Sequence, residues 1–210
     1  MISDFALPNP LPRSFYNRSA LVVAKELLGK LLVRNLEEGL LIGKIVEVEA
    51  YLGAKDPASH AYRGPTKRNE MMFGEGGHLY VYFTYGMHFC ANVVTGKTGV
   101  AEAVLLRAVE PLDGIETMLR KRGFASLNRN LTNGPAKLCQ AFGIGRNENG
   151  TDLLGSEIFI VDAVTSRKEP IGVSTRIGVS RGKEKRWRFF VKGNEWVSKR
   201  NNTEYRRQKR

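Results

Sequence analysis

Residues 45–94 decide the fold, and they read IVEVEAYLG (45–53), ASHAYRGPTKRNEMMFGEGG (58–77) and HLYVYFTYGMHFCANVV (78–94). The first segment alternates apolar and polar residues with the period of two that predicts a β-strand. The third segment contains two strand-like runs around Tyr85-Gly86, which predicts an antiparallel hairpin with an aromatic apex. Acidic, tyrosine, histidine and asparagine side chains therefore lie among core-forming residues, which makes them candidates for a functional site.

Helices and further strands are predicted on both sides of this segment. Apolar residues at helical spacing predict a helix over Ser19–Leu28 that ends at Gly29. Two strands follow, Lys30–Leu36 and Leu40–Tyr51, joined by a turn at Glu37-Glu38-Gly39. The remaining predicted elements are helices over Leu112–Lys121 and from Asn133-Gly134-Pro135 to Phe142, and strands over Leu79–Thr84, Met87–Val94, Ser156–Ala163, Val173–Val179 and Arg186–Lys192.

The order of these elements indicates the fold class. Helices and strands are interspersed without a regular β-α-β repeat, which is typical of α+β proteins. The sequence contains no internal repeat and no linker long enough to divide it. We therefore expect a single α+β domain over residues 1–210, with a curved, mainly antiparallel β-sheet, flanking helices, and flexible ends at residues 1–12 and 199–210.

The charge of the chain indicates a polyanionic partner. The net charge is +12, and residues 181–210 hold 12 Lys or Arg against 3 Glu. Clustered basic side chains gain affinity for phosphates by releasing counterions, although solubility alone could explain a mild excess. No stretch approaches the roughly 18 consecutive apolar residues of a membrane span, and the N-terminus lacks the pattern of a signal peptide. We expect a cytoplasmic protein with no membrane partner.

Cysteine and histidine form no recognisable disulfide or metal motif. Cys90 and Cys139 are isolated from each other and from any CxxC pair, so both are expected to be reduced core residues. His60, His78 and His88 lie too far apart for a zinc motif, so only the fold could unite them at a metal. The sequence therefore predicts no metal site and no organic cofactor.

The acidic strand has two interpretations. Its period of two places Glu47, Glu49 and Tyr51 on one face and the intervening apolar residues on the other. The polar face could be a solvated sheet surface, which is the usual position of carboxylates. Because His60 and the aromatic hairpin follow closely, the same face could instead form the wall of a pocket, to which Tyr82 would also contribute.

The aromatic apex of the hairpin also has two interpretations. A hairpin apex projects outward, and an exposed aromatic residue such as Tyr85 lowers solubility. Tyr85 could therefore be a wedge that enters stacked bases, or it could fold back onto its own sheet.

Several motifs together resemble a known family. These are EVEAYLG, ASHAYRG, KRNEMMF, LYVYFTYGMHFCAN, AVLLRAVEPLDG and NGPAKLCQA, followed more weakly by RIGVSRG and FFVKGNEWVS. They resemble the alkyladenine, or 3-methyladenine, DNA glycosylases of the mammalian alkylpurine type, over most of residues 14–198. His88 stands where an aromatic residue is common in that family, and the basic tail after Arg200 has no matching counterpart.

The resemblance implies roles for the pocket residues. Glu49 resembles the general base that deprotonates the attacking water, and Arg107 the arginine that positions this water, with a structural ion pair as the alternative. Tyr51, His60 and Tyr82 are similar to the residues that sandwich the flipped base. The resemblance further assigns Asn92 to the pocket as a gatekeeper against guanine, with a tie between strands as the alternative. It places Tyr85 and Met87 at the inserted hairpin tip. The residues that it assigns to DNA phosphates are Arg63, Lys67, Arg68 and Lys137.

The function implied by this resemblance is that of a monofunctional DNA glycosylase. Such an enzyme flips an alkylated or deaminated purine out of double-stranded DNA, hydrolyses its N-glycosidic bond and leaves an abasic site. We expect it to act as a monomer. Two other functions remain open: a non-catalytic basic nucleic-acid-binding protein, and a metal-dependent nuclease with Glu47 and Glu49 as ligands.

Overall fold

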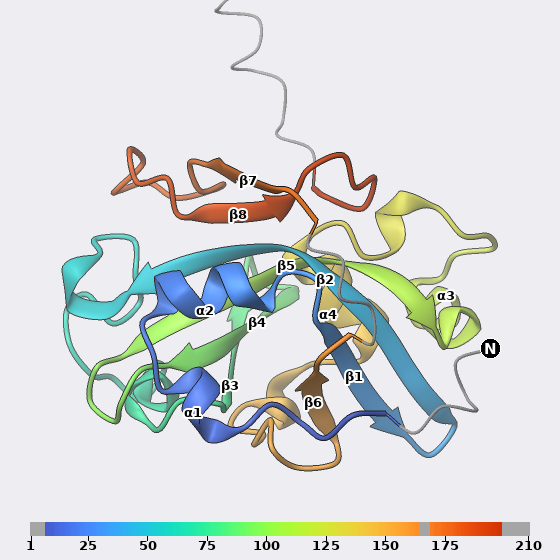
Figure 1. Cartoon of the computed structure of the whole chain (residues 1–210), viewed down its shortest axis with the longest axis horizontal. Coiled ribbons are helices and arrows are strands. Elements are labelled where there is room, and N and C mark those ends of the chain that lie inside the picture. Colours follow the sequence, from blue (N-terminus) through green and yellow to red (C-terminus); the bar gives the residue numbers. More distant parts are fainter. Residues whose placement is uncertain (1–6, 164–168, 199–210) are drawn as a thin grey trace, which may run out of the picture.

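The computed structural model describes residues 7–163 and 169–198 of the chain. Its helices are short and lie around a large sheet, which confirms the predicted α+β class (Figure 1). The helices are α1 (Arg13–Tyr16), α2 (Ala20–Leu27), α3 (Ile115–Arg122) and α4 (Pro135–Phe142), with 3-10 turns η1 (Gly53–Lys55), η2 (Glu70–Phe73), η3 (Arg129–Leu131) and η4 (Arg146–Glu148). The strands are β1 (Leu31–Leu36), β2 (Gly39–Leu52), β3 (Leu79–Thr84), β4 (His88–Thr95), β5 (Glu102–Asp113), β6 (Ile158–Val161), β7 (Ile171–Ser174) and β8 (Arg188–Val191).

The eight strands form one antiparallel sheet. The order along the sheet is β3-β4-β5-β2-β1-β6, and β8 pairs with both β2 and β7. The long strand β2 pairs with β5 along one edge. Along its other edge it pairs with β1 at Gly39–Lys44 and then with β8 at Glu47–Glu49. Residues 171–191 are therefore placed over the same stretch of β2 that carries the two glutamates.

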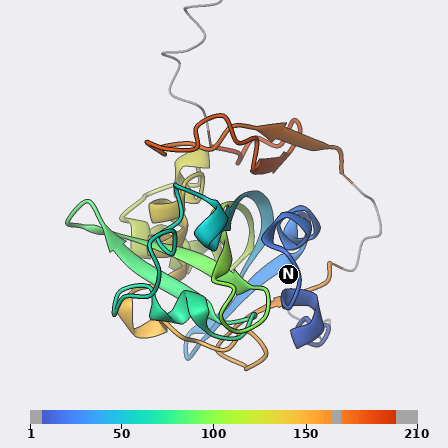
Figure 2. The ribbon, with the colours of Figure 1, turned by 90° about the vertical axis from the view of Figure 1, so that its left-hand side faces the viewer.

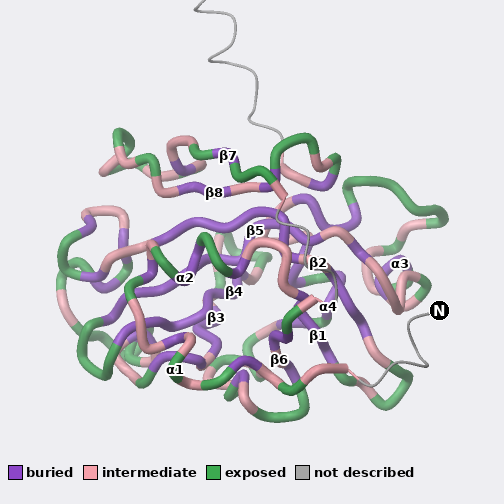
Figure 3. Tube along the Cα trace, viewed as in Figure 1, coloured by how far each residue is buried: buried purple, intermediate pink, exposed green. Residues whose placement is uncertain are grey.

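Helices α2 and α4 cover the central strands. The buried face of α2 includes Val23, Ala24 and Leu27, and this helix packs against β2 and β5. Helix α4 packs against β4 and β5 through residues that include Leu138 and Phe142. Figure 3 shows the result, with β2 and β5 buried over most of their length.

Both predicted hairpins are present, as β1–β2 and β3–β4, while one strand was missed and two predicted elements have the wrong bounds. Strand β5 was not predicted, and the expected helix over Leu112–Lys121 is wrong at its start, because β5 continues to Asp113. Gly114, with a φ of +69°, then turns the chain into α3. The expected strand over Val173–Val179 is wrong after Ser174, where the chain leaves the sheet.

The predicted flexible ends fall largely outside the described residues, which exclude residues 1–6 and 199–210. Within the described part, Leu11 does not fit that prediction, because it is buried and its backbone N–H donates to the Ile160 carbonyl at 2.8 Å. In the parts of the chain that the structure covers, no helix is long and apolar enough to cross a membrane.

Candidate active site

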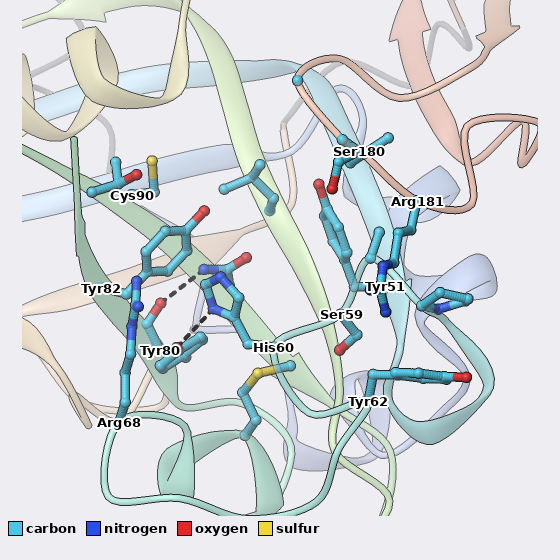
Figure 4. Close-up of a pocket in the computed structure, with 18 of the residues that line it drawn as sticks. Tyr51, Ser59, His60, Tyr62, Arg68, Tyr80, Tyr82, Cys90, Ser180 and Arg181 are labelled. Carbon is cyan, nitrogen blue, oxygen red and sulfur yellow. Dashed lines mark hydrogen bonds between the residues drawn. The ribbon is translucent and has the colours of Figure 1, made fainter.

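A cavity of about 640 Å³ opens beside the aromatic hairpin. Its walls come from the end of β2, from residues 57–72, from the β3–β4 hairpin and from residues 177–181. Figure 4 shows Tyr51 on one side of this space, with His60 and Tyr82 across from it. Of the predicted site residues, the cavity lining includes Tyr51, His60, Arg63, Arg68, Tyr82, Tyr85, Asn92 and Arg107.

Glu49 lies directly behind this lining. Its side chain is 0% exposed, so the interpretation of a solvated sheet surface is wrong. The Tyr51 hydroxyl donates to Oε2 at 2.8 Å, and the Ile177 backbone N–H donates to Oε1 at 2.8 Å. The Arg107 guanidinium lies 3.2 Å from the same Oε1. The three residues that hold Glu49, which are Tyr51, Arg107 and Ile177, all line the cavity themselves.

Glu47 is also fully buried, but its partners differ. Its Oε1 accepts from Arg107 Nε at 2.8 Å, Arg188 Nε at 2.7 Å and the Ser198 hydroxyl at 2.7 Å. Its Oε2 accepts the Ser198 backbone N–H at 2.6 Å. Burial by itself raises the pKa of Glu47, but Arg107 and Arg188 outweigh burial, and the pKa lies below its usual value. Glu47 is therefore a charged structural centre that is not itself part of the cavity lining, although its partner Arg107 is.

Arg107 joins the two carboxylates. Burial alone lowers its pKa, but the adjacent Glu49 and Glu47 reverse this effect and raise the pKa above that of a free arginine. Arg107 thus forms a structural ion pair, which was one interpretation of the sequence. It also lines the cavity, as an arginine that positions the attacking water would have to do.

The aromatic walls are fixed by hydrogen bonds and ring contacts. Burial and the neighbouring Glu49 raise the pKa of Tyr51 well above its usual value. The hydroxyl therefore keeps its proton and donates a hydrogen bond to the carboxylate. The His60 and Tyr82 ring centroids are 4.5 Å apart at 77°. His60 Nδ1 lies 2.9 Å from the Tyr80 hydroxyl. Burial and Arg68 lower the pKa of His60, so its ring is neutral near pH 7.

Asn92 ties two strands together and also lines the cavity. Its Nδ2 donates to the Tyr80 carbonyl at 3.0 Å, so it ties β4 to β3. It is also part of the cavity lining. Because only one N–H of Nδ2 is engaged with Tyr80, Asn92 can offer a ligand its second N–H as a donor and its Oδ1 as an acceptor.

The hairpin tip is exposed. Tyr85 is 83% exposed and Met87 is 71% exposed, so Tyr85 does not fold back onto its sheet. Tyr85 has a φ of +50°, a conformation that is uncommon for a bulky residue. Figure 2 shows the tip of the β3–β4 hairpin projecting from the body of the protein.

The predicted phosphate contacts surround the cavity. Arg63 and Arg68 belong to its lining, and Lys67 lies exposed between them in the chain. Lys137 is in the first turn of α4, whose first residue, Pro135, also reaches the cavity. None of these four basic residues forms an ion pair with a carboxylate of the described residues, whereas Arg13, Arg18, Arg34, Lys44, Arg107, Arg176 and Arg188 all do.

Several site residues were missed by the sequence analysis. Tyr80, whose hydroxyl lies 2.9 Å from His60 Nδ1, was given no role. Arg176 and Ile177 were expected in a strand, and no local pattern shows that they lie against Glu49. Their position depends on the pairing of β8 with β2, which the sequence does not reveal.

The side chains that could bind a metal are not clustered among the described residues. Throughout residues 7–163 and 169–198, no three His, Cys, Asp or Glu side chains are grouped so that they could hold an ion. The possible three-histidine site is therefore not formed by the fold.

The chain is similar to a family of known proteins over most of its length. A model of the family described as methylpurine-DNA glycosylase matches residues 14–195. A protein of Carboxydothermus hydrogenoformans is 56% identical over 190 residues, covering 90% of this chain and 98% of the relative. Proteins of Clostridium perfringens (46% identical, 90% and 98% covered) and Burkholderia cenocepacia (48% identical, 93% and 96% covered) are also similar. All three carry the name "Putative 3-methyladenine DNA glycosylase". The chain belongs to the methylpurine-DNA glycosylase family.

Proposed function

We propose that this protein removes 3-methyladenine and related alkylated or deaminated purines from double-stranded DNA, with Glu49 as the general base. The observation that carries the proposal is the position of the Glu49 carboxylate behind the aromatic cavity. A carboxylate has about four acceptor positions, and Tyr51, Ile177 and Arg107 occupy three of them. The remaining position can accept a hydrogen bond from one water molecule at the cavity wall.

In the proposed reaction, that water attacks C1′ of the damaged nucleotide. The N-glycosidic bond breaks, its electron pair leaves with the base, and the proton of the water passes to Glu49. The products are a free base and an abasic sugar with a hydroxyl at C1′. A purine alkylated at N3 or N7 is positively charged, which makes it a good leaving group. The neighbouring Arg107 would hold the water in place.

The aromatic walls would hold the base once it has been flipped out. Tyr51 on one side and His60 with Tyr82 on the other offer ring faces and edges to a planar base. Cation–π attraction to an alkylated purine contributes about 0.5–2 kcal/mol, which is modest by itself. Selection would therefore accumulate over extrusion, stacking and hydrolysis, because a damaged pair costs less to open.

The surface around the cavity supports duplex DNA as the partner. Tyr85 and Met87 project from the hairpin tip, where they could fill the gap left by the flipped base. Arg63, Arg68 and Lys137 have no carboxylate partner among the described residues, so their charges are available for phosphates.

The other two functions are less well supported. A nuclease that uses Glu47 as a metal ligand is disfavoured, because two guanidiniums and Ser198 already occupy that carboxylate. A non-catalytic binding protein would explain the charge but not Glu49, a buried carboxylate held by three residues of the cavity lining.

The experiment that tests the proposal is a base-release assay on a methylated DNA duplex, with and without EDTA. Released bases are identified by chromatography, and abasic sites are revealed by cleavage in alkali. We expect release of 3-methyladenine with intact strands before alkali and no effect of EDTA. Binding without release would support the non-catalytic protein, and EDTA-sensitive strand cleavage would support the nuclease.

A further inference from the structure

A second buried ion pair, Arg176 with Asp56, lies behind the cavity wall. Both side chains are 0% exposed. Arg176 Nη2 donates to Asp56 Oδ1 at 2.8 Å, and Nη1 contacts Oδ2. Neither residue lines the cavity. Because burying two charges carries a large desolvation cost, such a pair is weak evidence for a contribution to stability alone.

The guanidinium of Arg176 lies over two aromatic rings. It lies 4.6 Å from the centroid of Tyr51 and 5.1 Å from that of Trp187. One face of the Tyr51 ring is thus covered by Arg176, which leaves the other face for the cavity. The Tyr51 hydroxyl is bonded to Glu49, so the ring is fixed at its edge and on one face.

Arg176 and Asp56 also bind the backbone on both sides of the cavity. Arg176 Nη1 donates to the Ala50 carbonyl at 3.0 Å, on β2 beside Tyr51. Asp56 Oδ1 accepts the Ala58 N–H at 3.1 Å, at the start of the segment that carries His60. The residue after Arg176 is Ile177, whose N–H donates to Glu49. One ion pair therefore connects three parts of the wall: the end of β2, residues 57–60 and residues 177–181.

We infer that Arg176 is a positioning residue of this site. It fixes the plane of Tyr51 and the Ile177 N–H, and through these two groups it sets the direction of the Glu49 carboxylate. The inference rests on the proposed function, since it assigns Arg176 an effect on the hydrolytic step. It also predicts that Arg176 contributes little to binding of undamaged DNA, because its side chain is enclosed.

The test compares Arg176→Met with Arg34→Met. Arg34 is a matched control, because its side chain is 8% exposed, it pairs with Glu148 at 3.0 Å, and it is not part of the cavity lining. The assay measures 3-methyladenine release from methylated duplex with enzyme in excess, over a range of enzyme concentrations. This separates the maximal rate from the half-saturating concentration. Melting temperature and affinity for undamaged duplex are measured in parallel.

We expect Arg176→Met to lower the maximal rate about 10- to 100-fold, since a displacement of about 1 Å at a reacting group has effects of this size. Its affinity for undamaged duplex should stay within about twofold of wild type. Arg34→Met should lose melting temperature but keep the maximal rate within about twofold. Arg176→Lys, which keeps the charge but not the planar stacking, should have an intermediate rate.

Equal maximal rates for Arg176→Met and Arg34→Met, at a temperature where both are folded, would overturn the inference. If Arg176→Met does not fold, the double variant Arg176→Met/Asp56→Asn avoids an unpaired buried charge and is compared in the same way. A wild-type protein that releases no base would refute the proposed function, and this inference would fall with it. A wild-type protein that releases base while Arg176→Met and Arg176→Lys keep its maximal rate would refute the positioning role alone.

Discussion

Replacing Glu49 by Gln separates the proposed base from its structural surroundings. The amide keeps the size of the side chain and can still accept from Ile177 and Arg107, but it cannot take a proton from water. General bases contribute about 10²- to 10⁴-fold, so the single-turnover rate should fall by this factor. The corresponding loss of transition-state stabilisation is about 3–5 kcal/mol.

The cost of this substitution to the fold should be smaller. Arg107 loses one of its two carboxylates but keeps Glu47, whose Oε1 is 2.8 Å from its Nε. The loss of one charge-assisted hydrogen bond corresponds to about 2 kcal/mol in the free energy of unfolding. Lesion binding should persist, because neither the cavity walls nor the surface cations change.

Glu47→Gln is the matched control, since it changes the same residue type on the same strand at equal burial. It leaves Arg188 without its carboxylate, and breaking such a buried pair costs about 3–5 kcal/mol. We therefore expect Glu47→Gln to destabilise the protein more and to slow base release less than Glu49→Gln. The reasoning is refuted if Glu49→Gln retains near wild-type single-turnover rates, or if Glu47→Gln is the slower enzyme while fully folded.

Four further predictions concern the walls and the surface. Tyr85→Ala should weaken lesion binding or slow flipping with little change in melting temperature, because the side chain is 83% exposed; unchanged flipping with a large drop in melting temperature would contradict this. Asn92→Ser should increase release of guanine or 7-methylguanine relative to hypoxanthine, whereas a loss of all substrates in proportion to stability would make Asn92 purely structural. Burial and Arg68 lower the pKa of His60, so as pH falls the unfolded chain binds a proton at His60 before the folded protein does. The free energy of unfolding should therefore decrease as pH falls below the ordinary histidine pKa of 6.5. His60→Asn should flatten that decrease in a pH series of denaturant titrations. Deleting residues 201–210, which lie outside the described residues and carry four Lys or Arg, should flatten the dependence of log affinity for undamaged DNA on log salt, and an equal slope would show that they do not touch phosphate.

The sequence was sufficient for elements whose pattern is local. Alternation in residues 79–94 predicted the hairpin, and the structure pairs Tyr82 with Cys90 and Thr84 with His88 as that pattern requires. Helix α2 ends near the predicted Gly29 because its apolar face and its stop signal lie within one window. These elements could be predicted because one short stretch of sequence contains both the strand or helix periodicity and the residues that form the turn.

Strand β5 shows where local patterns are insufficient. It is buried at nearly every position, so it lacks the alternation that marks a half-buried strand. Pro111 is tolerated near the end of β5, because it lies at a register irregularity opposite Gly43. The site residues within 176–181 were missed for a related reason. Only the pairing of strands that are distant in the sequence brings this segment close to Glu49.

The contrast between Glu47 and Glu49 shows how that distant segment defines the site. Both glutamates lie on one face of β2, and the strand alone gives no reason for them to be buried. Their covering donors come from the C-terminal part of the chain: Ile177 for Glu49, and Arg188 and Ser198 for Glu47. Ser198 donates to both oxygens of Glu47, and the Arg188 guanidinium pairs with its charge. Glu47 is not part of the cavity lining. Ile177 contributes one neutral N–H to Glu49, and all three partners of Glu49 belong to the cavity wall. The same residue type thus becomes a structural anchor at one position and a candidate base two residues later, because different parts of one covering segment meet them.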